Sequence, residues 1–187
     1  MRGRLIVVSG PSGSGKTTIA QALLHANPEL AFSISATTRP IRPGEQHGKD
    51  YYFLTKDEFL RWRDAGAFVE WEELFGNLYG TPVSEVERAL QKGKHLLFDV
   101  DVKGALSIKR RYPEAVLIFV APPSPEILQQ RLRNRRTEDE TMLAARLARA
   151  AMELELGKQF DYSVVNDDRA RAITTVQAIV KQHLQSP

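Results

Sequence analysis

The segment VVSGPSGSGKTTIAQALL, residues 7–24, constrains the fold more than any other part of the sequence. Within it, Gly10–Thr17 matches the pattern G-x-x-x-x-G-K-[ST], with an apolar run before it and a helical pattern after it. Glycines let backbone N–H groups converge on phosphate oxygens, and the start of a helix adds partial positive charge. We therefore predict a loop that binds a nucleoside triphosphate, which we take to be ATP, rather than a glycine-rich turn with a surface lysine.

The chemistry of such a loop assigns roles to its last residues. Lys16 reaches the β- and γ-phosphate oxygens, and the Thr17 hydroxyl ligates Mg²⁺. Asp99 ends the apolar run HLLFD and is followed by Asp101, and an acid at a strand end near the loop suits a hydrated Mg²⁺ ion. The predicted ATP-binding residues of this segment are Gly10, Pro11, Ser12, Gly13, Ser14, Gly15, Lys16, Thr17 and Thr18.

Three short apolar runs predict the central strands: residues 4–9, 94–99 and 115–121, with weaker candidates at 32–35 and 162–166. Each is nearly continuous rather than alternating, as in strands that are buried on both faces of a parallel sheet. Helical patterns lie between them, which predicts a doubly wound α/β core. Residues 36–80 interrupt this rhythm with prolines, glycines and charges, and we interpret them as an inserted mixed subdomain.

Composition excludes several classes of protein. The 187 residues contain 42% hydrophobic and 26% charged residues, which fits one domain with an ordinary core. The sequence has no cysteine, and we expect a cytoplasmic protein without a signal peptide or a membrane-spanning segment. A formal charge of +3 suits an anionic ligand but is too small to indicate nucleic acid binding. Oligomeric state stays open.

A second anion site within the insert would distinguish a kinase from a switch GTPase or a motor. Arg39 and Arg42 flank prolines in TTRPIRPGE, and Tyr51 and Tyr79 lie in the same segment. Guanidinium groups on a stiff loop, together with tyrosine hydroxyls, are suited to hold a phosphate monoester. Either arginine alone would be interpreted as a solvated loop charge.

With these motifs in view, nearly the whole chain resembles guanylate kinases. The resemblance rests on SGPSGSGKTT, SISATTRPIRPGEQHGKDYYF, FVEWEELFGNLYGTP, DVDVKGA, RLRNRRTE and VNDD. It implies a P-loop NTPase-type parallel sheet flanked by helices, an inserted mixed α/β GMP-binding subdomain and a helical lid. It also implies ATP-dependent phosphorylation of GMP and dGMP with Mg²⁺, a role in purine nucleotide metabolism, and no nucleic acid or membrane partner.

The resemblance also implies roles for individual residues. The GMP phosphate would be bound by Ser35, Arg39, Arg42, Tyr51 and Tyr79. The guanine would be read by Glu70 and Thr81, and Asp99 and Asp101 are assigned to the same GMP site. Arg135 and Arg146 resemble lid arginines, and Asn166 in VNDD is assigned to ATP. The predicted catalytic residues are Lys16, Arg39, Arg42, Arg135 and Arg146.

Two residues depart from the family pattern, Lys103 in place of the frequent glutamine and Arg136 in place of the frequent glycine. The implied division of the chain is a core of residues 1–34, 82–125 and 156–187, a GMP-binding insert of residues 35–81 and a lid of residues 126–155. Two alternatives stay open: a binding module that no longer catalyses, and a kinase for another phosphorylated small molecule such as a ribose bisphosphate. The complete loop with Lys16 argues against the first, and Glu70 with Thr81 argues against the second.

Overall fold

The structure is a computed structural model that describes residues 3–133 and 140–185. The elements follow in the order β1 (Leu5–Ser9), α1 (Lys16–Ala26), β2 (Leu30–Phe32), β3 (Ala36–Thr37), β4 (Tyr52–Phe53), α2 (Lys56–Asp64), β5 (Phe68–Leu74), β6 (Asn77–Pro82), α3 (Val83–Gln91), β7 (His95–Asp99), α4 (Val102–Arg111), β8 (Val116–Ala121), α5 (Pro125–Arg133), α6 (Glu140–Leu156), η1 (Gly157–Gln159), β9 (Tyr162–Val165) and α7 (Arg169–Gln185).

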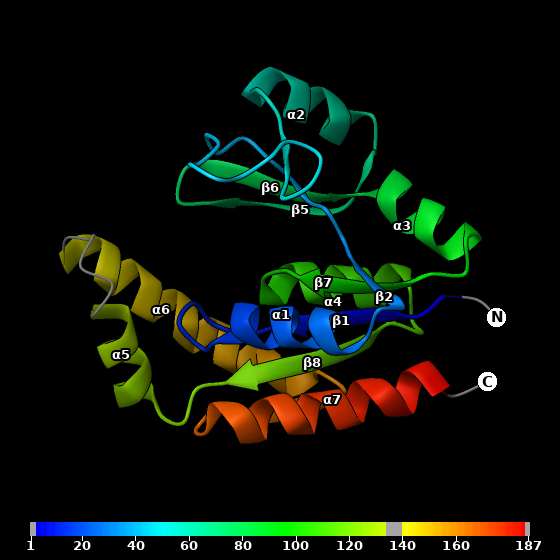
Figure 1. The fold of residues 1–187 in the computed structure, drawn as a ribbon. Coiled ribbons are helices and arrows are strands. Elements are labelled where there is room, and N and C mark those ends of the chain that lie inside the picture. The colour runs from blue at the N-terminus through cyan, green and yellow to red at the C-terminus, as the bar shows by residue number, and fades with distance from the viewer. Residues whose placement is uncertain (1–2, 134–139, 186–187) are drawn as a thin grey trace.

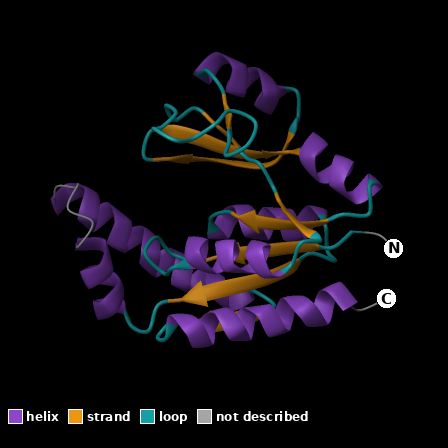
Figure 2. Cartoon of the chain, viewed as in Figure 1, coloured by secondary structure: helices purple, strands orange, loops and turns teal. Residues whose placement is uncertain are grey.

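The core is a five-stranded sheet in the order β2-β7-β1-β8-β9, and all of its paired strands are parallel. Figure 1 shows helices on both of its faces, with α7 running along one side, and Figure 2 shows the same layers by secondary structure. This confirms the predicted parallel α/β fold.

The apolar run of β1 is continuous because both faces of this strand are buried. Ile6 and Val8 pack with residues of α1 and α7, whereas Leu5 and Val7 pack with residues of α3 and α4 on the other face. All four side chains have 0% exposure. A strand between two helical layers has no face that needs a polar side chain, which explains the lack of alternation.

A second sheet, in the order β4-β3-β6-β5, lies beside the core and carries α2 (Figure 1). It is mixed, because β3 pairs with β4 in parallel but with β6 antiparallel. Its own small core forms around Phe59 of α2, whose ring stacks on Phe68 at a centroid distance of 4.4 Å. The capping box that starts α2 is present, with Thr55 and Glu58 bonded reciprocally.

Helices α5 and α6 form an arm at one end of the core, on the left in Figure 1. Leu128 and Leu132 of α5 pack against Leu147 and Ala150 of α6. The Ser124 hydroxyl accepts a hydrogen bond from the backbone N–H of Ile127 at 3.3 Å and so caps the start of α5. The predicted Arg135 and the divergent Arg136 lie outside the described residues.

Two local predictions differ from the structure. The strand predicted at residues 32–35 is Leu30–Phe32, because Leu30 is the residue that reaches the core, with 5% exposure. Helix α3 was not predicted, although Val83, Val86 and Ala89 recur every three residues along it. Across residues 3–133 and 140–185, no helix combines the length and apolar character needed to cross a membrane.

Candidate active site

The loop between β1 and α1 adopts the conformation that its glycines predict. Gly15 has φ 92° immediately before α1, and a Cβ at this position would lie 2.3 Å from Asn166 Nδ2. Asn166 donates that amide to the carbonyl oxygen of Ser14 at 2.7 Å, so it supports the loop from the end of β9. Pro11 and Ser14 are buried in the loop. Only glycine satisfies both the left-handed backbone and the close approach of Asn166.

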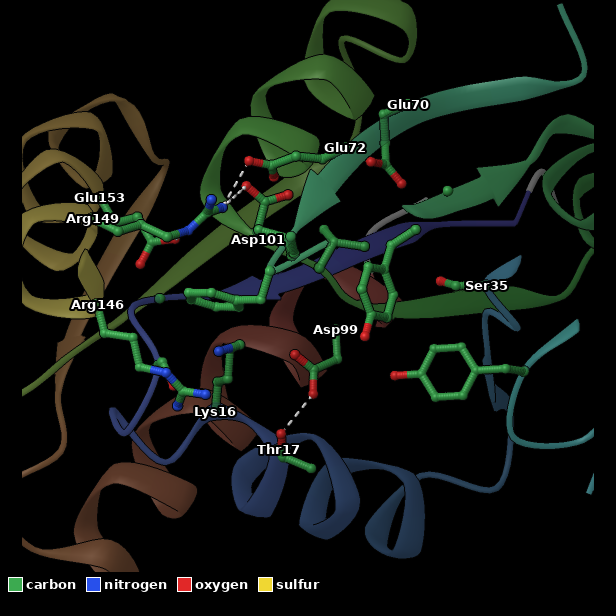
Figure 3. Close-up of a pocket in the computed structure, with 18 residues that line it drawn as sticks. Lys16, Thr17, Ser35, Glu70, Glu72, Asp99, Asp101, Arg146, Arg149 and Glu153 are labelled. Carbon is green, nitrogen blue, oxygen red and sulfur yellow. Dashed lines mark hydrogen bonds and ion pairs between the residues drawn. The ribbon is translucent and has the colours of Figure 1, made fainter. Parts of the chain in front are cut away.

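Thr17 and Asp99 meet next to this loop. The Thr17 hydroxyl donates a hydrogen bond to Asp99 Oδ2 at 2.9 Å (Figure 3), and Asp99 ends β7, the neighbour of β1. Burial raises the pKa of Asp99, while the charge of Lys16 and the Thr17 hydrogen bond oppose that rise. Mg²⁺ prefers oxygen ligands, and it is commonly bound by one or two protein oxygens together with phosphate oxygens. The Thr17 hydroxyl and the Asp99 carboxylate are ligands of this kind. The pair therefore fits this metal.

A cavity of about 300 Å³ opens between the loop, the second sheet and the arm. The loop contributes Gly10, Ser12, Lys16 and Thr17 to its wall, and α6 contributes Arg146, Arg149 and Glu153. The segment between β7 and α4 contributes Asp99, Val100 and Asp101. The remaining lining residues come from the segment 35–80: Ser35, Tyr51, Glu70, Glu72, Leu74, Phe75, Tyr79 and Gly80. Figure 3 shows Lys16 and Glu70 on opposite sides of the cavity. Eleven of these residues belong to the predicted site.

Glu70 is a buried carboxylate in the wall of the cavity. It faces Thr81 across β5 and β6, and the Thr81 hydroxyl donates a hydrogen bond to Glu70 Oε1 at 2.6 Å. Burial raises the pKa of Glu70 to about 7, against the opposing effect of that hydrogen bond. A Cβ at Gly104 would lie 2.8 Å from Glu70 Oε2 and 2.9 Å from Asp101 Oδ1, so the glycine leaves room for both carboxylates.

Arg39 and the two predicted tyrosines form one cluster. The Arg39 guanidinium lies 5.5 Å from the centre of the Tyr51 ring, and the Tyr51 and Tyr79 rings are 6.3 Å apart. Both tyrosines line the cavity. Arg39 also pairs with Glu45 at 2.7 Å, and Glu45 accepts a second hydrogen bond from the backbone N–H of Arg42 at 2.8 Å.

Arg39, Arg42 and Thr81 are not among the cavity-lining residues, and the side chain of Arg42 is exposed. Glu45 was not predicted as a site residue. Its position three residues after Arg42 is a turn spacing that suggests the hydrogen bond from the Arg42 backbone N–H. Lys103, the other divergent residue, is exposed on the first turn of α4.

A second hollow of about 440 Å³ lies on the other side of the loop. It is lined by Gly13, Gly15, Thr18, Arg131, Asn166, Asp167 and Arg169. Arg131 was not predicted; its guanidinium donates to the carbonyl oxygen of Asn166 at 3.2 Å. The hollow thus brings the predicted Thr18 and Asn166 together at the loop.

Two arginines of α6 reach into the main cavity from the arm. Arg146, which was predicted, lies with its guanidinium 4.9 Å from the centre of the Phe75 ring. Arg149, which was not, pairs with Glu72 at 2.9 Å, with Asp101 at 3.1 Å and with Glu153 at 2.8 Å. The i, i+4 spacing of Arg149 and Glu153 was the only signal for this network in the sequence.

Asp101 has a further structural role, because its carboxylate also caps α4. It accepts hydrogen bonds from the backbone N–H groups of Lys103 at 3.0 Å and Gly104 at 3.1 Å. These contacts hold the carboxylate at the cavity wall independently of Arg149. Among the described residues, no three His, Cys, Asp or Glu side chains group into a metal site.

Known proteins resemble this chain over nearly its full length. The family profile described as guanylate kinase matches residues 2–183. A guanylate kinase of Rubrobacter xylanophilus is 52% identical over 171 residues, which cover 91% of this chain and 90% of that protein. A guanylate kinase of Symbiobacterium thermophilum is 49% identical, with 96% of this chain and 85% of that protein covered.

The fold of this chain also matches that of a solved guanylate kinase structure. The crystal structure of guanylate kinase from Anaplasma phagocytophilum superposes with a TM-score of 0.79 at 34% identity. The match covers 99% of this chain and 88% of that one. Sequence and backbone therefore point to the same family across nearly the full length.

Proposed function

The chain belongs to the guanylate kinase family, enzymes that phosphorylate GMP with ATP, and we propose that its central cavity carries out this reaction with Mg²⁺ and accepts dGMP as well as GMP. One observation carries the proposal: Lys16 of the loop lines the same cavity as Glu70, which is hydrogen-bonded to Thr81. One end of that cavity suits a polyphosphate, and the other suits a base with hydrogen-bond donors.

ATP occupies the loop from Gly10 to Thr17. The backbone N–H groups and Lys16 bind the β- and γ-phosphates, and Thr18 and Asn166 border the hollow beside the triphosphate. Thr17 and Asp99 would hold Mg²⁺, partly through water, and the bound ion would supply positive charge beside the phosphate oxygens. The 2.9 Å contact between Thr17 and Asp99 supports this assignment.

GMP occupies the side of the cavity formed by the second sheet. The Glu70 carboxylate accepts from N1–H and the exocyclic amino group of guanine, two donors that adenine lacks at those edges. Arg39, Arg42, Ser35, Tyr51 and Tyr79 bind the phosphate. Because this recognition involves the base and the phosphate, loss of the ribose 2′-hydroxyl leaves it intact, and dGMP serves as a substrate.

Catalysis then consists of alignment and charge stabilisation. The acceptor is an already ionised phosphate, so no general base is required. The transferring phosphoryl group spreads negative charge over its equatorial oxygens, and Lys16 together with Arg146 stabilises that charge. Figure 3 shows Arg146 pointing toward Lys16, which supports a shared target. Arg135, outside the described residues, is assigned to the same role.

This function divides the chain into three parts. Residues 35–81 bind GMP, residues 126–155 act as the lid, and the remaining core binds ATP. The buried cluster around Phe59 in the second sheet and the separate α5–α6 packing support units that move as bodies. The metabolic role is the return of GMP to GDP in the cytoplasm.

One assay tests the proposal. ATP is incubated with GMP, dGMP, AMP, CMP or UMP, with and without a chelator of Mg²⁺, and the products are identified. We expect turnover on GMP and dGMP only, and its loss on chelation. Equal turnover on AMP and GMP would overturn the guanine assignment, and binding of both nucleotides without turnover would indicate a binding module.

A further inference from the structure

Arg149 connects three parts of the molecule through one guanidinium group. It lies on α6 of the arm and pairs with Glu72 of β5 in the second sheet and with Asp101 at the start of α4 in the core. Glu153, one turn further along α6, accepts from Arg149 Nε at 2.8 Å and orients the side chain. Figure 3 shows the guanidinium reaching toward Glu72 and Asp101.

The network is largely buried. The side chain of Arg149 is 21% exposed, and those of Glu72, Asp101 and Glu153 are 16%, 12% and 5% exposed. Burial and the neighbouring Asp101 raise the pKa of Glu72, while Arg149 opposes that rise. Arg149 therefore supplies the positive charge that lets a carboxylate of the sheet and one of the core lie close together where water is largely excluded.

A second contact joins α6 to the turn that follows β5, one helical turn away along α6. Arg146 lies three residues before Arg149 on α6, and Phe75 lies three residues after Glu72, directly after β5 ends at Leu74. The Arg146 guanidinium is 4.9 Å from the centre of the Phe75 ring. Phe75 has φ 49°, a left-handed conformation that is uncommon for a residue other than glycine. The hairpin turn therefore holds this ring against the arm.

We propose that Arg149 is a positioning residue: it ties the lid helix to the GMP-binding sheet and the core, and so brings Arg146 to the cavity when GMP is bound. The inference rests on the proposed role of Arg146 at the transferring phosphoryl group. If GMP orders the sheet and the sheet holds the lid, GMP and ATP must strengthen each other's binding, and by linkage the effect is equal in both directions.

A purely structural ion network would behave differently. It would lower the thermal stability of the protein when disrupted, but it would leave the mutual effect of the two nucleotides and the turnover of the folded enzyme unchanged. The coupling between the nucleotides and the separation of kcat from KM are therefore the decisive measurements.

The experiment uses Arg149→Met, which keeps an unbranched apolar stem and removes the guanidinium group with its charge and hydrogen-bond donors. GMP affinity is measured with and without a non-hydrolysable ATP analogue, and kcat and KM are measured with ATP and GMP. Lys158→Met is the control, because Lys158, in the turn η1 directly after α6, forms an exposed ion pair of 2.6 Å with Glu155 in the last turn of that helix. We expect Arg149→Met to reduce the coupling about fivefold or more and kcat about tenfold, with little change in the affinity for GMP alone.

Glu72→Gln provides a second variant that preserves shape and remains informative if Arg149→Met does not fold. We expect the same changes to a smaller extent, and we expect the double variant to lose no more than Arg149→Met alone, because both substitutions remove one interaction. Lys158→Met should behave as the wild type does.

Several results would overturn the inference: no coupling in the wild type, wild-type coupling in a folded Arg149→Met or Glu72→Gln variant, or fully additive losses in the double variant. A lower melting temperature with unchanged coupling would show a structural role alone. Absence of turnover by the wild type on ATP and GMP would instead overturn the proposed function, which is measured first and independently.

Discussion

Thr81 and Glu70 form a 2.6 Å hydrogen bond across two antiparallel strands, in which the hydroxyl donates to Oε1 of a buried carboxylate. This bond leaves the other carboxylate oxygen on the side of Gly104 and Asp101. A carboxylate held in this way can accept hydrogen bonds from a base but has little freedom to turn away from it. In the proposed site, this pair would link the fold of the second sheet to the choice of nucleotide.

Glu70→Gln should weaken discrimination for guanine. The amide keeps the shape of the side chain but replaces one acceptor by a donor, which faces a donor of the base. We expect kcat/KM for GMP to fall about 100-fold or more, while the affinity for ATP changes little. Steady-state kinetics with GMP and AMP, together with ATP titration, check this. Loss of ATP binding with an unchanged base preference would mean that Glu70 is misassigned.

The pH dependence should have opposite signs for stability and for GMP binding. The pKa of Glu70 is raised to about 7 from 4.5, so the folded state holds a proton that the unfolded state releases between these values. The contribution of Glu70 to stability is therefore full below pH 4.5 and decreases as the pH rises to about 7, by about 3 kcal/mol at most. GMP needs the ionised form, so its affinity should increase through the same range.

The matched control is Glu70→Gln, which removes this ionisation and leaves that of the GMP phosphate. Chemical denaturation and GMP titration between pH 5 and pH 8 measure both trends in the two proteins. Identical pH profiles for the wild type and the variant would contradict the assignment.

Lys16→Ala should abolish most activity without unfolding the protein. The lysine starts α1 and faces the cavity, and its ammonium group is assigned to the transferring phosphoryl group. Removal of one such charge from a preorganised site costs about 100- to 1000-fold in kcat. A circular dichroism melt tests the fold and a coupled assay tests the rate; more than a tenth of the wild-type kcat would speak against this role.

Arg39→Ala and Glu45→Gln should have different effects on GMP. Arg39 pairs with Glu45 at 2.7 Å, so in the proposed site the phosphate of GMP would compete with Glu45 for the guanidinium. Loss of Arg39 should raise KM for GMP about 10- to 100-fold, because a charge-assisted hydrogen bond contributes about 1.5–3 kcal/mol. Glu45→Gln should not raise it. A similar rise in both variants would indicate that the pair acts as a structural unit.

Gly104→Ala tests the space in which the two carboxylates lie. A Cβ there would approach Glu70 Oε2 to 2.8 Å and Asp101 Oδ1 to 2.9 Å, so these side chains must move. Alanine favours the helix by about 1 kcal/mol relative to glycine. This gain opposes the cost of moving the two side chains, so the melting temperature should change little. KM for GMP should rise about tenfold through the displaced carboxylates. An unchanged KM would show that Glu70 has room to adjust.

The parallel core was predictable because its signals are local. The apolar run before the loop and the pattern Gly10–Thr17 are continuous in the sequence. Burial on both faces gives each central strand the same pattern, an uninterrupted run of apolar residues. Strand β2 was displaced in the prediction because only one of its residues, Leu30, is deeply buried. A three-residue strand at the sheet edge carries too little pattern to define its ends.

Sequence alone determined the phosphate loop, the parallel α/β core and, through its resemblance to guanylate kinases, the family; it also predicted the residues that we propose to face the nucleotides. Tertiary structure alone decided the contacts of Arg149 with Glu72 and Asp101 and the raised pKa of Glu70. The Arg149 contacts with Glu72 and Asp101 span 77 and 48 positions along the chain. Such contacts arise only when separate layers pack together. The pKa of a carboxylate depends on its burial, and burial is a property of the same packing.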